Sequence, residues 1–279
     1  MADRQTELQQ LLRTLKLPAI AAVYEDLALK AAKANLTHEE FLYELLQAEC
    51  LQREEHRVAR LLRLSGLPPD KTFRTLQLER FPPLIRQQLE RLRSGAFLED
   101  AVNVVAAGKP GVGKSHALAA IGHELVLQGH QVLWTPTAKL VQELLAAKRD
   151  LRLPHLLAKL DRYACVFLDD IGYVQHDRDE MEVLFTFLSE RYERRSVGIS
   201  TNLTFSEWER IFKNPMTTLA AIDRVVHHSV ILDLMGMDSY RAKEAGDQHA
   251  RPGALGLDAD EAGAAACLNN ITLTMRSVK

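Results

Sequence analysis

The chain has 279 residues, of which 47% are hydrophobic and 26% charged, and its formal net charge is −2. This composition predicts a globular protein with one large domain or two modest ones, and it shows no overall basicity that would indicate nucleic acid. Cys50, Cys165 and Cys267 are widely spaced, which argues against a disulfide framework or a zinc site. Because no signal-peptide core and no run of ~20 apolar residues is present, we expect a cytoplasmic protein with no membrane partner.

Residues 1–95 have the pattern of a small all-helical domain. In NLTHEEFLYELLQAE, Thr37 and Glu40 form a capping box, and apolar residues then recur at helical spacing. This helix should end near Gly66, before Pro68 and Pro69. A further helix, PLIRQQLERLR, follows Pro82, and no convincing strand is present in this part of the chain.

From about residue 101 the pattern changes to alternating strands and helices. We expect short apolar strands at 101–108, 131–136, 164–170, 196–201 and 229–234, and helices at 114–129, 137–150, 178–195 and 218–228. This alternation predicts an α/β domain over residues 96–245 with a largely parallel sheet. Residues 246–279 are rich in alanine, glycine and aspartate without a sustained period, so we expect a mostly disordered tail.

A phosphate-binding loop is predicted between the first strand and the helix that follows it. Residues 106–122, AAGKPGVGKSHALAAIG, contain G-x-x-x-x-G-K-[ST], where glycines let backbone N–H groups wrap a phosphate. The lysine places a charge on the β- and γ-phosphates, the serine hydroxyl faces Mg²⁺, and the helix dipole favours the anion. The alternative is a glycine-rich turn that matches by chance. The expected nucleotide-binding residues are Gly108, Lys109, Pro110, Gly111, Val112, Gly113, Lys114, Ser115 and His116.

Two carboxylates end the strand CVFLDD. Acids at the end of a buried strand are costly unless a cation or hydrogen bonds compensate them. With Ser115, Asp169 is therefore the expected Mg²⁺ ligand, directly or through water, and Asp170 is expected to polarise the attacking water. The alternative is a pair of aspartates that cap the turn at Ile171 and Gly172. Together with the phosphate loop, the strand predicts a protein that binds a nucleoside triphosphate and Mg²⁺.

Two further residues are candidates for catalysis. Asn202 follows the strand SVGIST, and the carboxyl ends of parallel strands share the edge that carries the phosphate loop. It can reach the γ-phosphate or the attacking water, unless it only starts the turn NLTFSEW. Arg224, on the helix before the last strand, is the best candidate for a cation facing the γ-phosphate of a neighbouring subunit. The alternative is a local ion pair with Asp223 or an acid at the sheet edge. Rival cations are Arg191, Arg194 and Arg195; His227 and His228 are expected to be structural, because nothing at metal-ligand spacing accompanies them.

One segment has a local positive charge. Residues 51–95 contain ten Lys or Arg and five acids, and four arginines lie along about a third of a helical turn. Such a stripe can follow DNA phosphates and release counterions. The alternative is an ordinary solvated face whose arginines pair with Glu49, Glu54 and neighbouring acids. The expected DNA-contacting residues are Arg53, Arg57, Arg60 and Arg63, and without a base-reading motif the contacts should be to backbone and shape.

Several of these segments together resemble the IstB family, AAA+ ATPases encoded beside the transposase in a class of bacterial insertion sequences. The similarity covers about residues 8–245 and includes GKPGVGKSH, CVFLDDIGYV, LSERYERRSVGISTNLTFSEW, AAIDRVVHHSVILDL and DSYRAK. It implies an AAA+ P-loop core, an oligomer with ATP between protomers, and an ATP-dependent helper that assembles on double-stranded DNA, remodels it and recruits or activates a transposase. By the same resemblance, 108–115 is the Walker A loop, Asp169 the Walker B magnesium residue, Asn202 the sensor-1 residue and Arg224 the arginine finger.

The sequence departs from the AAA+ pattern at two places. Asp170 stands where many AAA+ proteins have glutamate, so hydrolysis should be slow. Only 45 residues follow Leu234, without a helical lid pattern, so no separate lid domain is expected and Arg241 receives no role. A DnaC-like helicase loader, a small-molecule P-loop kinase and a regulatory ATP-binding module without hydrolysis remain alternatives.

Overall fold

The computed structural model describes residues 2–173, 178–208 and 215–240. The tail expected over 246–279, and Arg241, lie outside the described residues. The chain divides into two compact units, residues 1–60 and 61–279. Residues 61–95 thus fold with the second unit, and the domain boundary expected at residue 95 stays a prediction. No described helix is long and apolar enough to cross a membrane.

The first unit is helical, as its sequence pattern predicts. It contains α1 (Ala2–Thr14), α2 (Pro18–Ala34) and most of α3 (His38–Ser65). The capping box before α3 is confirmed, because Glu40 N–H donates to Thr37 Oγ1 at 3.2 Å and Thr37 N–H donates to Glu40 Oε2 at 2.7 Å. Leu12, Ile20 and Leu45 form a small core of one residue from each helix.

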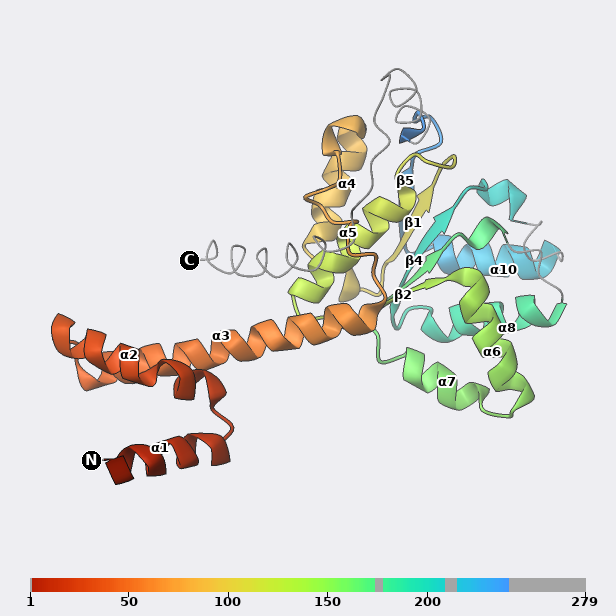
Figure 1. The fold of residues 1–279 in the computed structure, drawn as a ribbon. Coiled ribbons are helices and arrows are strands. Elements are labelled where there is room, and N and C mark those ends of the chain that lie inside the picture. The colour runs from red at the N-terminus through yellow and green to blue at the C-terminus, as the bar shows by residue number, and fades with distance from the viewer. Residues whose placement is uncertain (1, 174–177, 209–214, 241–279) are drawn as a thin grey trace, which may run out of the picture. The chain divides into compact units, whose positions relative to one another are not determined.

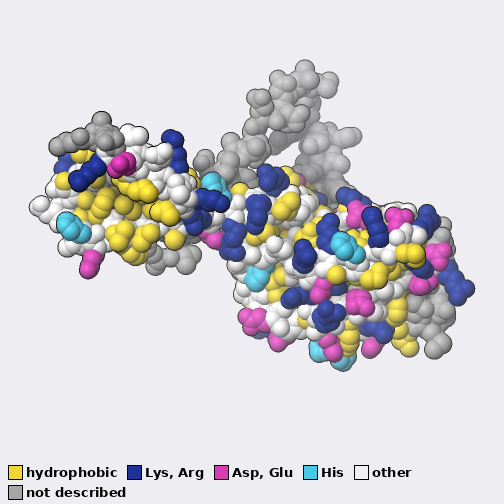
Figure 2. Space-filling view, turned by 90° about the horizontal axis from the view of Figure 1, so that it is seen from below, with side chains coloured by type: hydrophobic (Ala, Val, Ile, Leu, Met, Phe, Trp, Pro, Cys, Tyr) yellow, Lys and Arg dark blue, Asp and Glu magenta, His cyan; other side chains and the backbone are white. Residues whose placement is uncertain are grey.

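This unit leaves many apolar side chains uncovered. Figure 2 shows hydrophobic side chains gathered on one face of its helices. Its small core explains the exposure, because a unit of about 60 residues has little interior in which to bury leucines. The exposed large side chains of the unit are Leu8, Leu11, Leu15, Leu29, Leu42, Tyr43, Leu46 and Leu51.

The second unit is built around one parallel sheet of five strands in the order β2-β3-β4-β1-β5. All five predicted strands are confirmed, as β1 (Asn103–Ala107), β2 (Val132–Pro136), β3 (Cys165–Asp169), β4 (Ser196–Thr201) and β5 (Ser229–Asp233). The interior strand β1 pairs with β4 on one side and β5 on the other, and it is buried along its whole length. Such strands have apolar residues on both faces, which is why each of them is a continuous apolar run in the sequence.

Helices cover both faces of this sheet (Figure 1). On one side lie α4 (Pro83–Arg93) and α5 (Lys114–Leu127). On the other lie α6 (Thr137–Arg149), α7 (Leu153–Leu160), α8 (Arg178–Arg191) and α10 (Pro215–Val226). Short 3-10 turns complete the unit at Leu78–Arg80, Ala96–Leu98, Ile171–Tyr173 and Phe205–Glu207. No helix was expected at α7, because its eight residues contain too few turns for a helical period to be recognised.

Candidate functional site

The phosphate loop connects β1 to α5, in the strand–loop–helix order that the sequence predicts. Gly111 and Gly113 have φ values of 81° and 105°, which residues with a Cβ rarely adopt. Gly108 is required for a steric reason, because a Cβ there would lie 2.9 Å from Leu234 Cβ. With the amino end of α5 at Lys114 behind it, this backbone is suited to an anion.

Lys114 is folded back on the loop. Its Nζ donates to the carbonyl oxygens of Gly108 at 2.7 Å and Lys109 at 2.9 Å, and only 6% of the residue is exposed. The ammonium group is therefore held beside the phosphate-binding backbone. Lys109 and Pro110, in contrast, are exposed side chains on the outer part of the loop.

Ser115 and Asp169 come together as the sequence predicts for two residues that share one Mg²⁺. Ser115 Oγ donates to Asp169 Oδ1 at 2.7 Å, across the gap between α5 and the end of β3. A hydroxyl and a carboxylate are oxygen ligands of the kind that Mg²⁺ binds, alone or through its waters. The pair fits that ion chemically.

Ser200 is part of this group and was missed in the sequence. Its Oγ donates to Asp169 Oδ1 at 2.6 Å and accepts the N–H of Asp170 at 2.8 Å. One fully buried hydroxyl on β4 therefore positions the Asp169 carboxylate and the Asp170 backbone. Its only sequence signal is a polar residue inside an apolar strand, which by itself does not point to a partner on the neighbouring strand.

Asp170 adopts a left-handed backbone with φ of 59° and is exposed, directly after β3. Asparagine and aspartate tolerate this conformation better than other residues with a Cβ. The turn places Asp170 outside the strand, at the carboxyl edge of the sheet where the phosphate loop also lies. This is the position that a residue facing the γ-phosphate needs.

Asn202 lies against the turn that follows Asp170. Its Oδ1 is buried beside Gly172 and has no hydrogen-bond partner among the residues that the structure describes. The turn after β4 is instead held by Thr201, whose Oγ1 accepts the N–H of Leu203 at 3.1 Å. The Asn202 side-chain oxygen is therefore not among the groups that hold this turn, and its expected role in catalysis stays a prediction.

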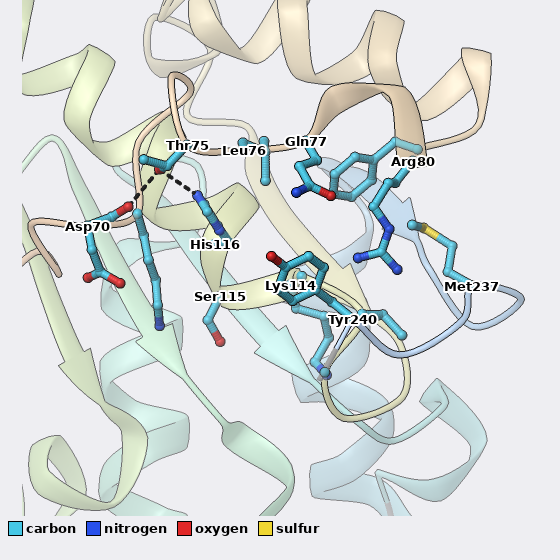
Figure 3. Close-up of a pocket in the computed structure, with 15 residues that line it drawn as sticks. Asp70, Thr75, Leu76, Gln77, Arg80, Lys114, Ser115, His116, Met237 and Tyr240 are labelled. Atoms are coloured by element: carbon cyan, nitrogen blue, oxygen red, sulfur yellow. Dashed lines mark hydrogen bonds between the residues drawn. The ribbon is translucent and has the colours of Figure 1, made fainter. Parts of the chain in front are cut away.

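A cavity of about 340 Å³ opens beside the phosphate loop. Gly111 to His116 and Tyr240 line one side of it, and residues of the segment 70–81 line the other, with Met237 at one end. Figure 3 shows Thr75, Leu76, Gln77 and Arg80 opposite Ser115, Lys114 and Tyr240. The cavity extends from the phosphate-binding backbone and offers space for the base and ribose of a nucleotide. The contributions of residues 70–81, Met237 and Tyr240 to the cavity were not predicted from the sequence.

His116 links the phosphate loop to the segment 70–81 on the opposite side of the cavity. Its Nε2 lies 3.1 Å from Thr75 Oγ1 and 3.2 Å from the carbonyl oxygen of Thr72. Burial lowers the pKa of His116 below its ordinary value, so the neutral ring is favoured at pH 7. This residue, expected to bind nucleotide, lines the cavity but directs its side chain to the segment 72–75.

The last described residues close one end of the cavity. Tyr240 N–H donates to the carbonyl oxygen of Gly111 at 2.8 Å. The guanidinium of Arg80 stacks over the Tyr240 ring at 4.9 Å and donates to the carbonyl oxygen of Asp238 at 3.2 Å. The segment that follows β5 thus contacts both the phosphate loop, through Gly111, and the segment 70–81, through Arg80.

Arg224 lies on α10, away from the residues that line this cavity. Its guanidinium stacks over Phe185 of α8 at 4.7 Å and donates to the carbonyl oxygen of Ala220 at 3.1 Å. The alternative to a catalytic role, an ion pair with Asp223, is absent among the described residues. The rivals have local roles: Arg191 is buried and donates to three carbonyl oxygens, Arg194 pairs with Asp161 at 3.0 Å, and Arg195 donates to the Asp161 carbonyl oxygen.

The four arginines expected to contact DNA all lie on α3, and their surroundings differ. Arg53 pairs with Glu49 at 2.8 Å, and Arg57 pairs with Glu54 at 2.6 Å, as the alternative of an ordinary paired face predicts. The remaining arginines are exposed and make no ion pair in the part of the chain that the structure describes; they are Arg60 and Arg63. Two of the four charges are thus already matched within the chain.

Fold and site together define an AAA+ P-loop protein, in which a parallel five-stranded sheet flanked by helices presents a phosphate loop, a serine and two strand-end acids at one edge. AMPPCP-bound DnaA from Aquifex aeolicus has a similar fold, with a TM-score of 0.52 and 12% identity over 77% of this chain and 62% of that one. At this identity the likeness concerns the fold alone.

The chain belongs to the family of IstB-like ATP binding proteins, which it matches over residues 10–247. It is 40% identical to an insertion sequence ATP-binding protein of Sinorhizobium fredii, over 88% of this chain and 83% of that protein. It is 36% identical to the ATP-binding protein of insertion sequence IS21 from Pseudomonas aeruginosa, over 85% of this chain and 89% of that protein. The predicted family, AAA+ fold and ATP-binding role are thereby confirmed.

Proposed function

We propose that this chain is a Mg²⁺-dependent ATPase that assembles on double-stranded DNA, remodels it and recruits or activates the transposase of an insertion sequence. The observation that carries the proposal is the group made by Ser115, Asp169 and Ser200 beside the phosphate loop, in a chain whose relatives are named as insertion sequence proteins. The phosphate loop would bind the triphosphate, the group would hold the ion, and an exposed acid, Asp170, lies at the same edge of the sheet.

In this proposal each residue has a separate task. Lys114 binds the β- and γ-phosphates, and Ser115 and Asp169 hold Mg²⁺, which would neutralise phosphate charge when bound. Asp170 accepts hydrogen bonds from the attacking water, and the Asn202 amide helps to orient that water. Because aspartate is one methylene shorter than glutamate, turnover should be slow and should increase when subunits assemble.

The DNA contacts are assigned to the unpaired part of the α3 stripe. Arg60 and Arg63 are exposed and lack acid partners among the described residues, whereas Arg53 and Arg57 would have to leave Glu49 and Glu54. Breaking an existing pair offsets part of the gain from a phosphate contact. Arg60 and Arg63 should therefore contribute most to the attraction for the DNA backbone.

Sedimentation with long duplex DNA over a salt series tests this function. We expect large protein–DNA complexes that require ATP and weaken as salt rises. The double variant Arg60→Ala, Arg63→Ala should reduce the slope of log K against log salt by about 2, because each lost phosphate contact removes ~0.9. A matched control, Arg149→Ala with Arg152→Ala, removes the same charge from an exposed part of the second unit and should leave the slope unchanged. ATP binding without any change in DNA affinity would instead favour a helicase loader.

Arg224 is proposed to act on ATP bound by a neighbouring subunit. To do so its guanidinium must leave two contacts that the described residues make with it, the ring of Phe185 and the carbonyl oxygen of Ala220. We expect Arg224→Ala to lower ATP turnover by about 10³-fold in the assembled state, because it removes a charge from the transition state. Turnover measured at low protein concentration, without DNA, should be unaffected.

The control for this variant is Arg195→Ala, which removes an exposed arginine near the end of α8. It should retain turnover in both states. An equal loss for Arg224→Ala in dispersed and assembled protein, accompanied by a lower unfolding temperature, would instead assign Arg224 a structural role against α8.

A further inference from the structure

Three side chains outside the nucleotide site converge at the ends of two neighbouring helices. Glu193 lies in the turn after α8, and His227 and His228 lie between α10 and β5. One potential ligand atom from each residue lies within 4.8 Å of the other two, and all three residues are exposed. From the sequence we expected the two histidines to be structural, because Glu193 is far from them along the chain.

The backbone at both places is fixed. The carbonyl oxygen of His228 accepts the N–H of Asn103 at 2.7 Å, and His227 N–H donates to the carbonyl oxygen of Asp223 at 2.9 Å. Glu193 has a left-handed φ of 56°, in a turn where Arg194 N–H donates to the carbonyl oxygen of Arg191. The hydrogen-bonded backbone thus keeps the three Cα positions close to one another.

We propose that Glu193, His227 and His228 bind a transition-metal ion of the Zn²⁺ class. Two imidazoles and a carboxylate suit such an ion, and the fourth position would be open to water. Ligands at ~2.1 Å from a tetrahedral ion lie roughly 3.4 Å apart. His228 Nε2 and Glu193 Oε1 are 3.6 Å apart, close to that spacing.

The neighbouring tyrosine provides the support that metal-binding histidines commonly have. Tyr192 Oη lies 3.5 Å from His227 Nδ1. If Nδ1–H donates to the phenol oxygen, the lone pair of Nε2 is left for the ion. The two imidazoles stand at 85° to one another with centroids 4.5 Å apart, so they do not stack face to face and both keep exposed edges.

The site is separate from the Mg²⁺ residues. β5 begins at Ser229 beside Asn103, where β1 also begins, whereas the phosphate loop follows the other end of β1. A bound ion would connect the turn after α8 to the junction of α10 and β5. The proposal therefore stands on its own, whatever the outcome for ATP hydrolysis or DNA assembly.

Zn²⁺ titration of the full chain by calorimetry tests the proposal. The protein should be treated with EDTA and carry Cys50→Ser and Cys267→Ser, because thiols also bind Zn²⁺. We expect one ion per chain and a higher unfolding temperature with Zn²⁺ but not with Mg²⁺. His227→Ala, His228→Ala and Glu193→Gln should each weaken binding at least tenfold. His155→Ala, which removes an exposed histidine from α7, should not.

The histidine variants also distinguish a metal site from a simple ion pair. An ion pair between His228 and Glu193 does not involve His227, so replacing His227 should not affect it. A three-ligand site, in contrast, loses metal affinity when either histidine is replaced. Co²⁺ gives a second measurement, since its visible absorption should change on binding and the change should be lost in His227→Ala. Equal Zn²⁺ affinity in all variants, or binding only while the cysteines are present, would overturn the proposal. Unfolding curves without metal check that each variant folds.

Discussion

Replacing Lys114 by alanine should weaken ATP binding at least about 100-fold, which corresponds to about 2.7 kcal/mol. The Lys114 ammonium group is buried against the phosphate loop, where Nζ already donates to two loop carbonyl oxygens. Hydrogen bonds to charged groups contribute about 1.5–3 kcal/mol each. The loss of one or two such bonds between Nζ and the phosphates of ATP is therefore sufficient for this effect. Titration with a fluorescent ATP analogue measures it directly.

Lys109→Ala is the matched control for this variant. It removes a lysine from the same loop, but that side chain is exposed on the outer part of the loop and should contribute little to affinity. Lys114→Met provides a second test, because it retains the buried stem and removes only the charge. If both Lys114 variants fold and bind ATP with ordinary affinity, the phosphate-loop assignment is wrong.

Local sequence signals predicted the strands and the phosphate-binding end of the sheet. β1, β3 and β4 are short, mostly apolar runs that end at Ala107, Asp169 and Thr201, and this pattern follows from burial on both faces of a parallel sheet. The meeting of Ser115 with Asp169 could also be predicted, because both residues were assigned to the same ion. The phosphate loop and the strand that ends in two acids can each be recognised from one short segment.

Contacts between distant segments could not be predicted in the same way. The contact of Thr75 with His116 depends on how the residues before β1 fold over α5. The link from Ser200 to Asp169 requires knowledge that β4 pairs with β3. Single polar residues in such places give no sign of their partners, so the wall of the cavity and the positioning serine become visible only in the structure.

The pairing of the α3 arginines lies between these cases. Glu49 precedes Arg53 by four residues, so the helical period alone suggests the ion pair. It does not show that Glu49 is buried and also accepts the N–H groups of Ala19 and Ile20 at the start of α2. Arg53 thus neutralises a carboxylate that holds two helices together, which explains why we assign the DNA contacts to Arg60 and Arg63 instead.

Asp170→Asn should separate ATP binding from hydrolysis. Asparagine tolerates the left-handed backbone at this position and keeps the size of the side chain, so the turn after β3 should not change. A carboxylate that polarises water contributes about 10²–10⁴-fold to the rate. We expect single-turnover hydrolysis to slow by about 10²-fold or more, while ATP affinity measured by calorimetry changes less than about threefold.

Two comparisons decide whether this loss belongs to Asp170 itself. Asp150→Asn makes the same chemical change at the exposed end of α6 and should leave hydrolysis intact. Asp169→Asn alters the residue that accepts hydrogen bonds from Ser115 and Ser200, so it should also reduce the Mg²⁺ dependence of ATP binding. If Asp170→Asn hydrolyses ATP at the normal rate, the attacking water is activated elsewhere, and the buried acceptor of Asn202 becomes the next group to test. If both Asp169→Asn and Asp170→Asn lose binding together, the two acids act as one unit, because Ser200 ties the Asp169 side chain to the Asp170 backbone.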